Sequence, residues 1–243
     1  MKPRFSIGTI AVFLVLALIF SCFPLSASAA SVTTINQTAA LRSIPESGMM
    51  CLTFDDGYGP TNIKRVLDSL REEGICCTFF VIGKCLKSYP DLWKQAVADG
   101  HEIAYHSMRH YSMGRWSNKK ILADIEAWNK VAKEVLGEDY VIPKIARLPG
   151  GSGHRNSRIL KLFNGLGYTV IGWNADTLTG VKKPRTAKKV ASYVLRHAKV
   201  GTICLQHFNS VDSKSVSLYL KKLKEKGIPL GRISDALAAA NIG

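Results

Sequence analysis

Apolar and polar positions alternate in two patterns from Met49 onward, and each pattern predicts a different element. Short apolar runs typical of buried strands occupy Met49–Phe54, Cys77–Ile82, Glu102–Tyr105, Lys144–Leu148, Tyr168–Trp173 and Thr202–Gln206. Longer stretches with apolar residues three and four apart predict helices at Thr61–Glu73, Asp91–Asp99, Asn118–Leu136, Ser157–Leu166, Ala187–His197 and Ser213–Lys226. This repeated alternation predicts an α/β domain, with one parallel sheet covered by helices and either open or closed into a barrel.

The first thirty residues have a different pattern. Lys2 and Arg4 precede an apolar run from Ile7 to Phe20, which is followed by Ala27-Ser28-Ala29. This order predicts a secretory signal peptide at 1–29, and the apolar run is shorter than the ~20 residues that span a bilayer. An uncleaved membrane anchor is the alternative. Residues 30–47 are polar and are expected to form an N-terminal arm before a single domain at 48–243.

The charge of the chain is strongly positive. The formal net charge is +15, and removal of residues 1–29, which hold two basic residues and no acidic one, would leave +13. Such a charge attracts polyanions, including nucleic acid, acidic wall polymers and anionic membranes. The export signal and the scattered lysines argue against nucleic acid, so we interpret the charge as suited to an acidic cell envelope.

The cysteines offer no metal or redox motif. Five of them follow the signal segment, namely Cys51, Cys76, Cys77, Cys85 and Cys204, and an odd number leaves at least one thiol unpaired in a monomer. No CxxC spacing occurs, which argues against a thiolate zinc site. Most of these residues lie in apolar runs, where cysteine acts as a small buried hydrophobe.

Two carboxylates and two imidazoles follow the first and third predicted strands. Asp55 and Asp56 precede Gly57, and one carboxylate could bind a metal while the other accepts a proton. His106 and His110 are four residues apart and could bind one cation if the segment forms a helical turn. Together with Asp56 they would supply a His₂Asp set suited to Zn²⁺, Fe²⁺ or Co²⁺. Taken alone, the Asp-Asp-Gly motif favours an ordinary turn, and a chance His pair of this spacing is common.

Further polar residues follow the later strands. Arg147 enters a tight turn and could hold a carboxylate through a bidentate fork. Asp176 and His207 follow the fifth and sixth strands, where an Asp could keep an imidazole protonated as a general acid. A surface arginine and a histidine bonded to a loop carbonyl are the structural alternatives. The ordered set favours a shared site, because the carboxyl ends of parallel strands meet at one edge.

The same segments resemble a known family. In order, TFDDGY, HSMRH, RLPGG, WNAD and LQH resemble the five motifs of the polysaccharide deacetylases, the NodB-homology domain of carbohydrate esterase family four. The resemblance extends from about Met49 to about Ile233 and is strongest to peptidoglycan and chitooligosaccharide deacetylases. It implies a distorted (β/α) barrel and identifies 48–243 as a catalytic domain.

The resemblance also implies roles for single residues. Asp55 would be the catalytic base, held by Arg147, and Asp176 would orient His207, the general acid. The metal ligands would be Asp56, His106 and His110. The backbone N–H of Tyr58 would bind the oxyanion, Leu205 would line the acetyl pocket, and Trp173 and Pro149 would contact substrate.

The implied activity is metal-dependent removal of N-acetyl groups from N-acetylglucosamine-type sugars of peptidoglycan or a related polysaccharide, with release of acetate. Zn²⁺ is the expected metal, with Co²⁺, Fe²⁺ or Mn²⁺ possible. The protein is expected to be secreted, associated with the cell wall and monomeric, with no nucleic-acid or obligate protein partner.

Two departures from the family pattern leave alternatives open. Thr179-Gly180 stands where members often have Asp-Trp, and Phe208 stands where an Asp is common. The Trp usually walls the acetyl pocket, so the acyl preference is affected. The alternatives are an O-acetyl esterase acting on xylan and a catalytically weak wall-binding relative.

Overall fold

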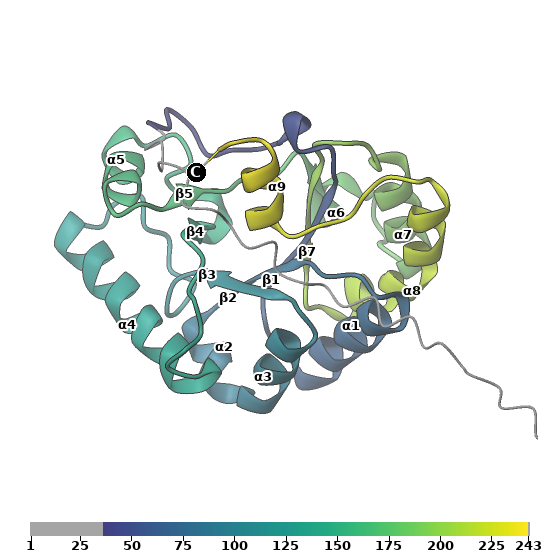
Figure 1. Cartoon of the computed structure of the whole chain (residues 1–243), viewed down its shortest axis with the longest axis horizontal. Helices are drawn as coiled ribbons and strands as arrows, with labels where there is room; N and C mark the ends of the chain where they lie inside the picture. The colour runs from purple at the N-terminus through teal and green to yellow at the C-terminus, as the bar shows by residue number, and fades with distance from the viewer. Residues whose placement is uncertain (1–35, 243) are drawn as a thin grey trace, which may run out of the picture.

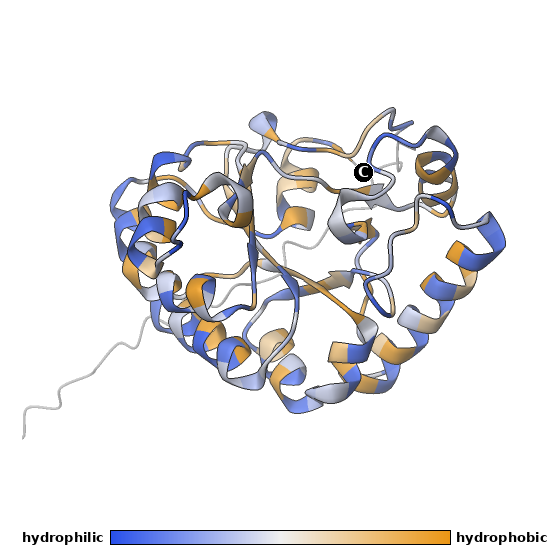
Figure 2. Ribbon diagram, turned by 180° about the vertical axis from the view of Figure 1, so that it is seen from behind, coloured by the Kyte–Doolittle hydropathy of each residue, from blue (hydrophilic) through white to orange (hydrophobic). Residues whose placement is uncertain are grey.

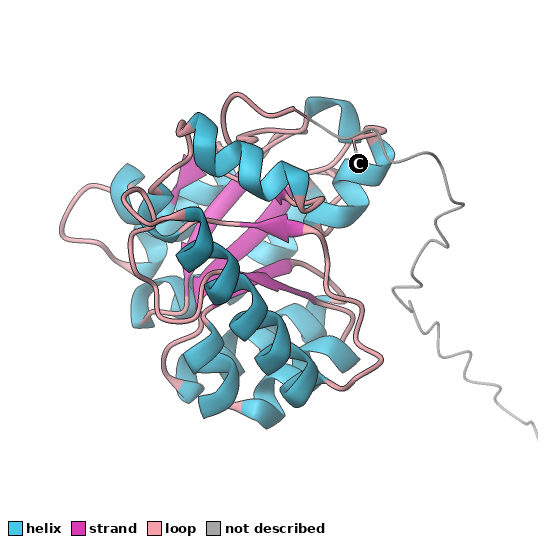
Figure 3. Cartoon of the chain, turned by 90° about the vertical axis from the view of Figure 1, so that its left-hand side faces the viewer, coloured by secondary structure: helices cyan, strands magenta, loops and turns pink. Residues whose placement is uncertain are grey.

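A computed structural model describes residues 36–242, so the expected signal segment lies outside the described residues. Within this part of the chain, seven strands form one sheet in the order β5-β4-β3-β2-β1-β7-β6, and all paired neighbours are parallel. The strands are β1 (Cys51–Asp56), β2 (Thr78–Val81), β3 (Glu102–Tyr105), β4 (Ile145–Ala146), β5 (Thr169–Val170), β6 (Ala175–Asp176) and β7 (Ile203–His207). The sheet curls into the distorted barrel that the family resemblance implied, with helices outside it (Figures 1 and 3).

The helices are α1 (Pro60–Glu73), α2 (Gly83–Ser88), α3 (Pro90–Ala98), α4 (Asn118–Leu136), α5 (Ser157–Gly165), α6 (Thr177–Gly180), α7 (Ala187–Arg196), α8 (Ser210–Glu225) and α9 (Ile233–Ala239), with 3₁₀ turns η1 (Pro45–Ser47) and η2 (Pro149–Gly151). Most of them cover the outer face of the sheet, but α9 packs against its inner face, where Ile233, Ala236 and Leu237 join a cluster with Cys51, Phe80 and Ala104. The outer helices carry both hydrophobic and hydrophilic bands (Figure 2), as helices packed on one side do. Between residues 36 and 242, no helix is long and apolar enough to cross a membrane.

All six predicted helices and all six predicted strands are observed, with shifts at their ends, but two strands are much shorter than predicted, and Lys144–Leu148 forms strand only at Ile145–Ala146. The run Tyr168–Trp173 forms strand only at Thr169–Val170, and Asp176 lies on the separate strand β6. β5 and β6 occupy opposite edges of the sheet. The chain between them therefore crosses the gap in the barrel, which interrupts strand pairing. α2, α6 and α9 were not predicted, because helices of four to seven residues are too short to show a period.

The later half of the expected polar arm is part of the barrel wall. The N–H of Leu41 donates to the carbonyl of Val170 (2.8 Å), and its carbonyl accepts from Gly172 (2.7 Å). On the other side, the N–H of Ile44 donates to the carbonyl of Gly201 (3.0 Å), and the Ile44 side chain is buried. Residues 40–44 thus fill the space between the two sheet edges and pack as part of the domain that follows.

Phe208, one of the two departures, belongs to the core. Its ring centroid lies 5.6 Å from that of Phe54, 5.3 Å from Phe79 and 5.5 Å from Trp93. The side chain is buried. The substitution therefore fills an aromatic cluster in the core.

Four of the cysteines are free and buried, namely Cys51, Cys77, Cys85 and Cys204. Burial raises the pKa of Cys51 to about 12 and that of Cys85 to about 11. Because the thiolate is the reactive form, these side chains act as small hydrophobes, as the apolar runs around Cys51, Cys77 and Cys204 indicated.

Candidate active site and metal centre

Asp55 lies at the end of β1 and is paired with a buried arginine. Nη1 of Arg147 donates to Oδ1 of Asp55 and to Oγ1 of Thr53, both at 2.7 Å, and Nη2 donates to the carbonyl of Gly172 at 2.9 Å. The guanidinium also stacks on Phe80, with Cζ 4.1 Å from the ring centroid. These contacts fix one carboxylate oxygen of Asp55. The other oxygen, Oδ2, lies 3.7 Å from Nε2 of His106.

A glycine turn sends the next carboxylate to different partners. Asp56 has a φ of 80° and Gly57 a φ of 93°, a region that glycine adopts at little cost. A Cβ at position 57 would lie 2.7 Å from the ring of Trp93, so glycine is also needed for space. This turn lets Asp56 face two histidines while Asp55 faces Arg147.

His106 and His110 lie in a tight turn after β3, not in the helical turn that their spacing would require. Ser107 and His110 have φ values of 63° and 59°. Oγ of Ser107 accepts from the N–H of His110 (2.9 Å), and Oδ1 of Asp124 accepts from the N–H of Met108 (3.0 Å). Side-chain acceptors therefore replace helical bonding and bring the two imidazoles together, with ring centroids 5.0 Å apart.

Asp56, His106 and His110 form a group that can hold a metal ion. Oδ1 of Asp56 lies 3.6 Å from Nε2 of His106 and 3.4 Å from Nε2 of His110, and the three ligand atoms lie within 4.8 Å of one another. Ligand atoms in a tetrahedral site with bonds of about 2.0 Å are about 3.3 Å apart, so the two shorter separations fit.

The surroundings of the ligand atoms also fit a cation. Among the described residues, the buried atoms Oδ1 of Asp56 and Nε2 of His106 have no hydrogen-bond partner. Nδ1 of His106 bonds to the carbonyl of Arg147 at 2.7 Å, an outer contact that leaves Nε2 as the free ligand atom. The same arginine therefore positions Asp55 with its side chain and His106 with its backbone.

The charges around Asp56 favour its ionised form. Burial alone would raise the pKa of Asp56, but the proximity of His106 and the charges of His207 and His110 outweigh burial and lower it. Burial likewise opposes protonation of His106, yet Asp55 and Asp56 raise its pKa. For His110, burial and the charge of His106 lower the pKa. The group thus combines an ionised Asp56 with a neutral His110. A metal ion would also have to displace the proton that the two carboxylates favour on His106, because metal ligands bind in their deprotonated form.

The structure places His207 beside Asp55 but does not bond it to Asp176. His207 pairs with Asp55 in the register of β7 and β1, and Asp176 lies on the neighbouring strand β6. The Asp176 carboxylate caps α6, accepting from the N–H of Leu178 (2.8 Å) and the hydroxyl of Thr179 (2.7 Å). Nδ1 of His207 is buried without a hydrogen-bond partner in the described chain. The expected Asp176–His207 bond is therefore absent from this structure, because α6 uses the carboxylate.

Asp212, which the sequence interpretation missed, supports the backbone at His207. Its fully buried carboxylate accepts from the N–H of His207 (3.1 Å) and pairs with Arg185. Nε of Arg185 also donates to the carbonyl of Thr177 (3.1 Å), which links the strand ends that carry Asp176 and His207. Asn209 three residues before Asp212 is a helix-start signal in the sequence, but nothing local indicates the pairing with Arg185.

Replacing Asp212 by Ala is expected to destabilise the fold by about 3–5 kcal/mol, because Arg185 and the His207 N–H would lose a buried acceptor. Urea unfolding at neutral pH measures this change. Asp68→Ala is the control, since Asp68 and its partner Lys64 are 38% and 66% exposed and their pair contributes about 0.5 kcal/mol or less. Equal effects of the two substitutions would contradict the role given to Asp212.

The residues expected to contact substrate differ in exposure. Leu205 and Pro149 are buried, Trp173 is half-buried and Tyr58 is 53% exposed. Trp173 packs edge-on against His154, with centroids 5.3 Å apart. These four residues surround the mouth of the barrel, since they follow β1, β4 and β5 or lie on β7.

Position 180, where family members often have Trp, lies against the side chain of Tyr193. A Cβ at Gly180 would lie 2.4 Å from Cζ and Oη of Tyr193. The hydroxyl of Tyr193 accepts from the N–H of Asp176 at 3.1 Å. A tyrosine from α7 thus occupies the space beside the strand end, and a larger residue at 180 would require the Tyr193 side chain to move.

A parallel (β/α) barrel with an Asp/His/His group and a buried Asp–Arg pair at the carboxyl ends of its strands defines a class of barrel hydrolases with a candidate metal site. The comparisons specify the family within this class. The polysaccharide deacetylase family model matches residues 43–171, and the chain belongs to the polysaccharide deacetylase family. It is therefore a deacetylase of carbohydrate esterase family four.

Individual relatives agree with this assignment. A peptidoglycan-N-acetylglucosamine deacetylase of Bacillus cereus is 31% identical over 198 residues, which cover 78% of this chain and 88% of the relative. A solved deacetylase with substrate superposes with a TM-score of 0.68 at 30% identity, covering 79% of this chain and 93% of the other. A third structure is a mutant of a family pseudoenzyme from Bacillus anthracis in which enzymatic activity was restored. It superposes with a TM-score of 0.73 at 25% identity, covering 83% of this chain and 72% of the other.

Proposed function

We propose that this protein is a secreted, metal-dependent deacetylase that hydrolyses the N-acetyl groups of N-acetylglucosamine-type sugars in peptidoglycan or a related polysaccharide. The observation that carries the proposal is the convergence of Asp56, His106 and His110 beside Asp55, which Arg147 holds in place. The peptidoglycan-deacetylase relative supports the choice of substrate.

Asp56 and the Nε2 atoms of His106 and His110 would hold the metal, and zinc fits this ligand set best. When bound, such an ion lowers the pKa of water and polarises a carbonyl. The remaining chemistry is assigned to side chains of the chain itself.

Asp55 is suited to act as the general base. Its Oδ1 is occupied by Arg147, while Oδ2 faces the ligand group and is free to accept a proton from the attacking water. In the acetamide, the new bond forms between the water oxygen and the carbonyl carbon, and the C–N bond breaks. The products are acetate and a free amine.

His207 is suited to protonate the departing amine, because it lies opposite Asp55 on the adjacent strand. The backbone N–H of Tyr58 would stabilise the oxyanion, and Leu205 would line the acetyl pocket. Asp176 would have to leave its bonds within α6 to contact His207. We therefore assign the positioning of His207 to Asp212 as well.

We place the enzyme outside the cell, at the wall. The support is the signal-like order of residues 1–29 and the positive charge of the rest of the chain, which suits a polyanionic envelope.

Incubation with peptidoglycan fragments is expected to remove one acetyl group per reacting sugar and to release acetate, and a chelator is expected to stop the reaction. Mass spectrometry of the fragments measures both effects, and added Zn²⁺ should restore activity. Acetate from acetylated xylan but not from N-acetylglucosamine oligomers would favour an O-acetyl esterase. Absence of acetate from every substrate with metal present would favour a wall-binding relative without activity.

A further inference from the structure

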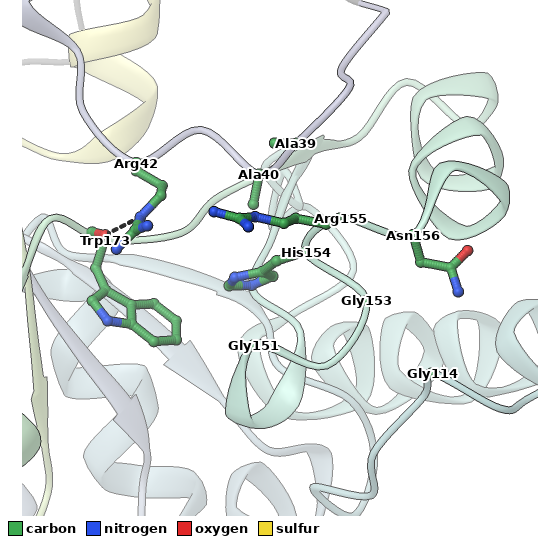
Figure 4. Close-up of a pocket in the computed structure, with 10 residues that line it drawn as sticks. All are labelled: Ala39, Ala40, Arg42, Gly114, Gly151, Gly153, His154, Arg155, Asn156 and Trp173. Atoms are coloured by element: carbon green, nitrogen blue, oxygen red, sulfur yellow. Dashed lines mark hydrogen bonds between the residues drawn. The ribbon is translucent and has the colours of Figure 1, made fainter.

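A pocket near the Asp55–Arg147 pair is lined by four segments that are distant in sequence. Its volume is about 640 Å³, and its walls come from 39–42, the loop 151–156, Trp173 and Gly114 (Figure 4). The N–H of Ala40 donates to the carbonyl of His154 at 2.8 Å, which holds the first two walls together. The pocket adjoins the catalytic centre, because the ring of Trp173 lies 5.7 Å from Cζ of the Arg147 that binds Asp55.

Two guanidinium groups at this pocket have no acidic partner. Within residues 36–242, neither Arg42 nor Arg155 forms an ion pair, and no acidic residue lines the pocket. Arg42 is anchored by its Nε, which donates to the carbonyl of Trp173 at 2.8 Å. The side chain of Arg155 extends over His154 toward Arg42 (Figure 4). Two like charges on one side of a pocket, with nothing to neutralise them, attract an anion.

The floor of the pocket offers a polar atom and an aromatic surface. Nε2 of His154 is buried and has no hydrogen-bond partner among the described residues. Burial, then the charge of Arg147, lowers the pKa of His154 to about 4, so the ring is neutral near pH 7. The half-buried ring of Trp173 lies beside it and supplies a flat amphipathic surface against which a sugar ring can pack.

We propose that this pocket binds a carboxylate carried by the sugar next to the one that is deacetylated. The inference rests on the proposed function and narrows its substrate to an acidic glycan. Paired guanidinium groups bind carboxylates through forked hydrogen bonds, and the unpaired His154 nitrogen supplies one more polar contact. Within a wall glycan, the carboxylate can come from the lactyl group of N-acetylmuramic acid or from an attached peptide. A neutral chitooligosaccharide has neither.

The test compares two tetrasaccharides of equal length, one alternating N-acetylglucosamine with N-acetylmuramic acid and one of N-acetylglucosamine alone. The measured quantity is the ratio of kcat/KM for the acidic and the neutral substrate. Arg42→Gln and Arg155→Gln are each expected to lower this ratio about tenfold at low ionic strength, and less at high salt. Arg155→Gln is the cleaner variant, because the Arg155 side chain makes no hydrogen bond within the described chain.

Arg196→Gln is the matched control, since it removes the same charge from an exposed position on α7, outside the pocket. Its ratio should equal that of the wild type. A ratio that is unchanged in both pocket variants, or changed equally in the control, would overturn the proposal. Two acidic fragments distinguish the sources of the carboxylate, one with a free lactyl group and one with a peptide attached to it. The fragment whose kcat/KM, relative to the neutral substrate, falls in the Arg42 and Arg155 variants is the one that carries the bound carboxylate.

Calorimetric binding of the two tetrasaccharides to the wild type separates this inference from the proposed function. Preferential binding of the acidic tetrasaccharide that is lost in Arg155→Gln would support the pocket even if no acetate were released. Equal binding of both tetrasaccharides by an active enzyme would contradict carboxylate binding in the pocket and leave the deacetylase assignment intact.

Discussion

Asp55→Asn is expected to lower kcat by about 10³-fold while metal binding is retained, within the 10²–10⁴-fold range of general-base catalysis. The amide keeps an oxygen that can accept from Nη1 of Arg147, so the geometry of the buried pair should survive. The amide nitrogen cannot accept a proton from water. The variant therefore removes the base and leaves Asp56, His106 and His110 in place.

Acetate release from N-acetylglucosamine oligomers measures this loss, and metal content after dialysis measures the ligand group. Thermal unfolding shows whether Arg147, now without an ionised partner, destabilises the barrel. Asp68→Asn provides the control, because it makes the same chemical change at an exposed ion pair of α1. Wild-type kcat in Asp55→Asn would remove Asp55 from the role of base.

His106→Ala is expected to abolish stoichiometric metal binding and to lower turnover by at least about 10³-fold. His106 supplies one of three ligand atoms, and its Nδ1 contact with the carbonyl of Arg147 fixes the orientation of the ring. A metal contributes several kcal/mol of transition-state stabilisation, which corresponds to a loss of this size.

Metal content and kcat are measured for His106→Ala in the same way as for Asp55→Asn. His197→Ala is the control, because His197 stacks on Tyr193 at the end of α7 and lies outside the ligand group. The two variants together separate the base from the ligands: one should keep metal without activity, and the other should lose both. Full metal content in His106→Ala would show that the ion binds elsewhere.

The features of the barrel that the sequence could not predict are contacts between segments that are distant in sequence. The spacing of apolar residues predicted each strand and helix separately, because it depends only on which face of a local segment is buried. It gave no sign that Leu41 and Ile44 pair with the chain near Val170 and Gly201, since these short stretches lack a period of their own. It also joined Trp173 to the strand before it, although the chain there crosses from one sheet edge to the other.

The site shows the same division. Asp55, Asp56, His106 and His110 could be singled out because each follows a strand, and parallel strands place such residues at one edge. The bond expected between Asp176 and His207 could not be judged in this way. Whether that carboxylate bonds to a neighbouring strand or to its own helix depends on Thr179 and the start of α6.

The sequence by itself determined the strand-helix alternation, the family and the residues that gather at the barrel mouth, because local periodicity and motif order are properties of the chain. Only the tertiary structure decided that residues 40–44 close the barrel, that Asp212 and Arg185 support His207, and that Arg42 and Arg155 converge beside Trp173. Those contacts join segments far apart in sequence, and their partners are selected by packing and charge in three dimensions.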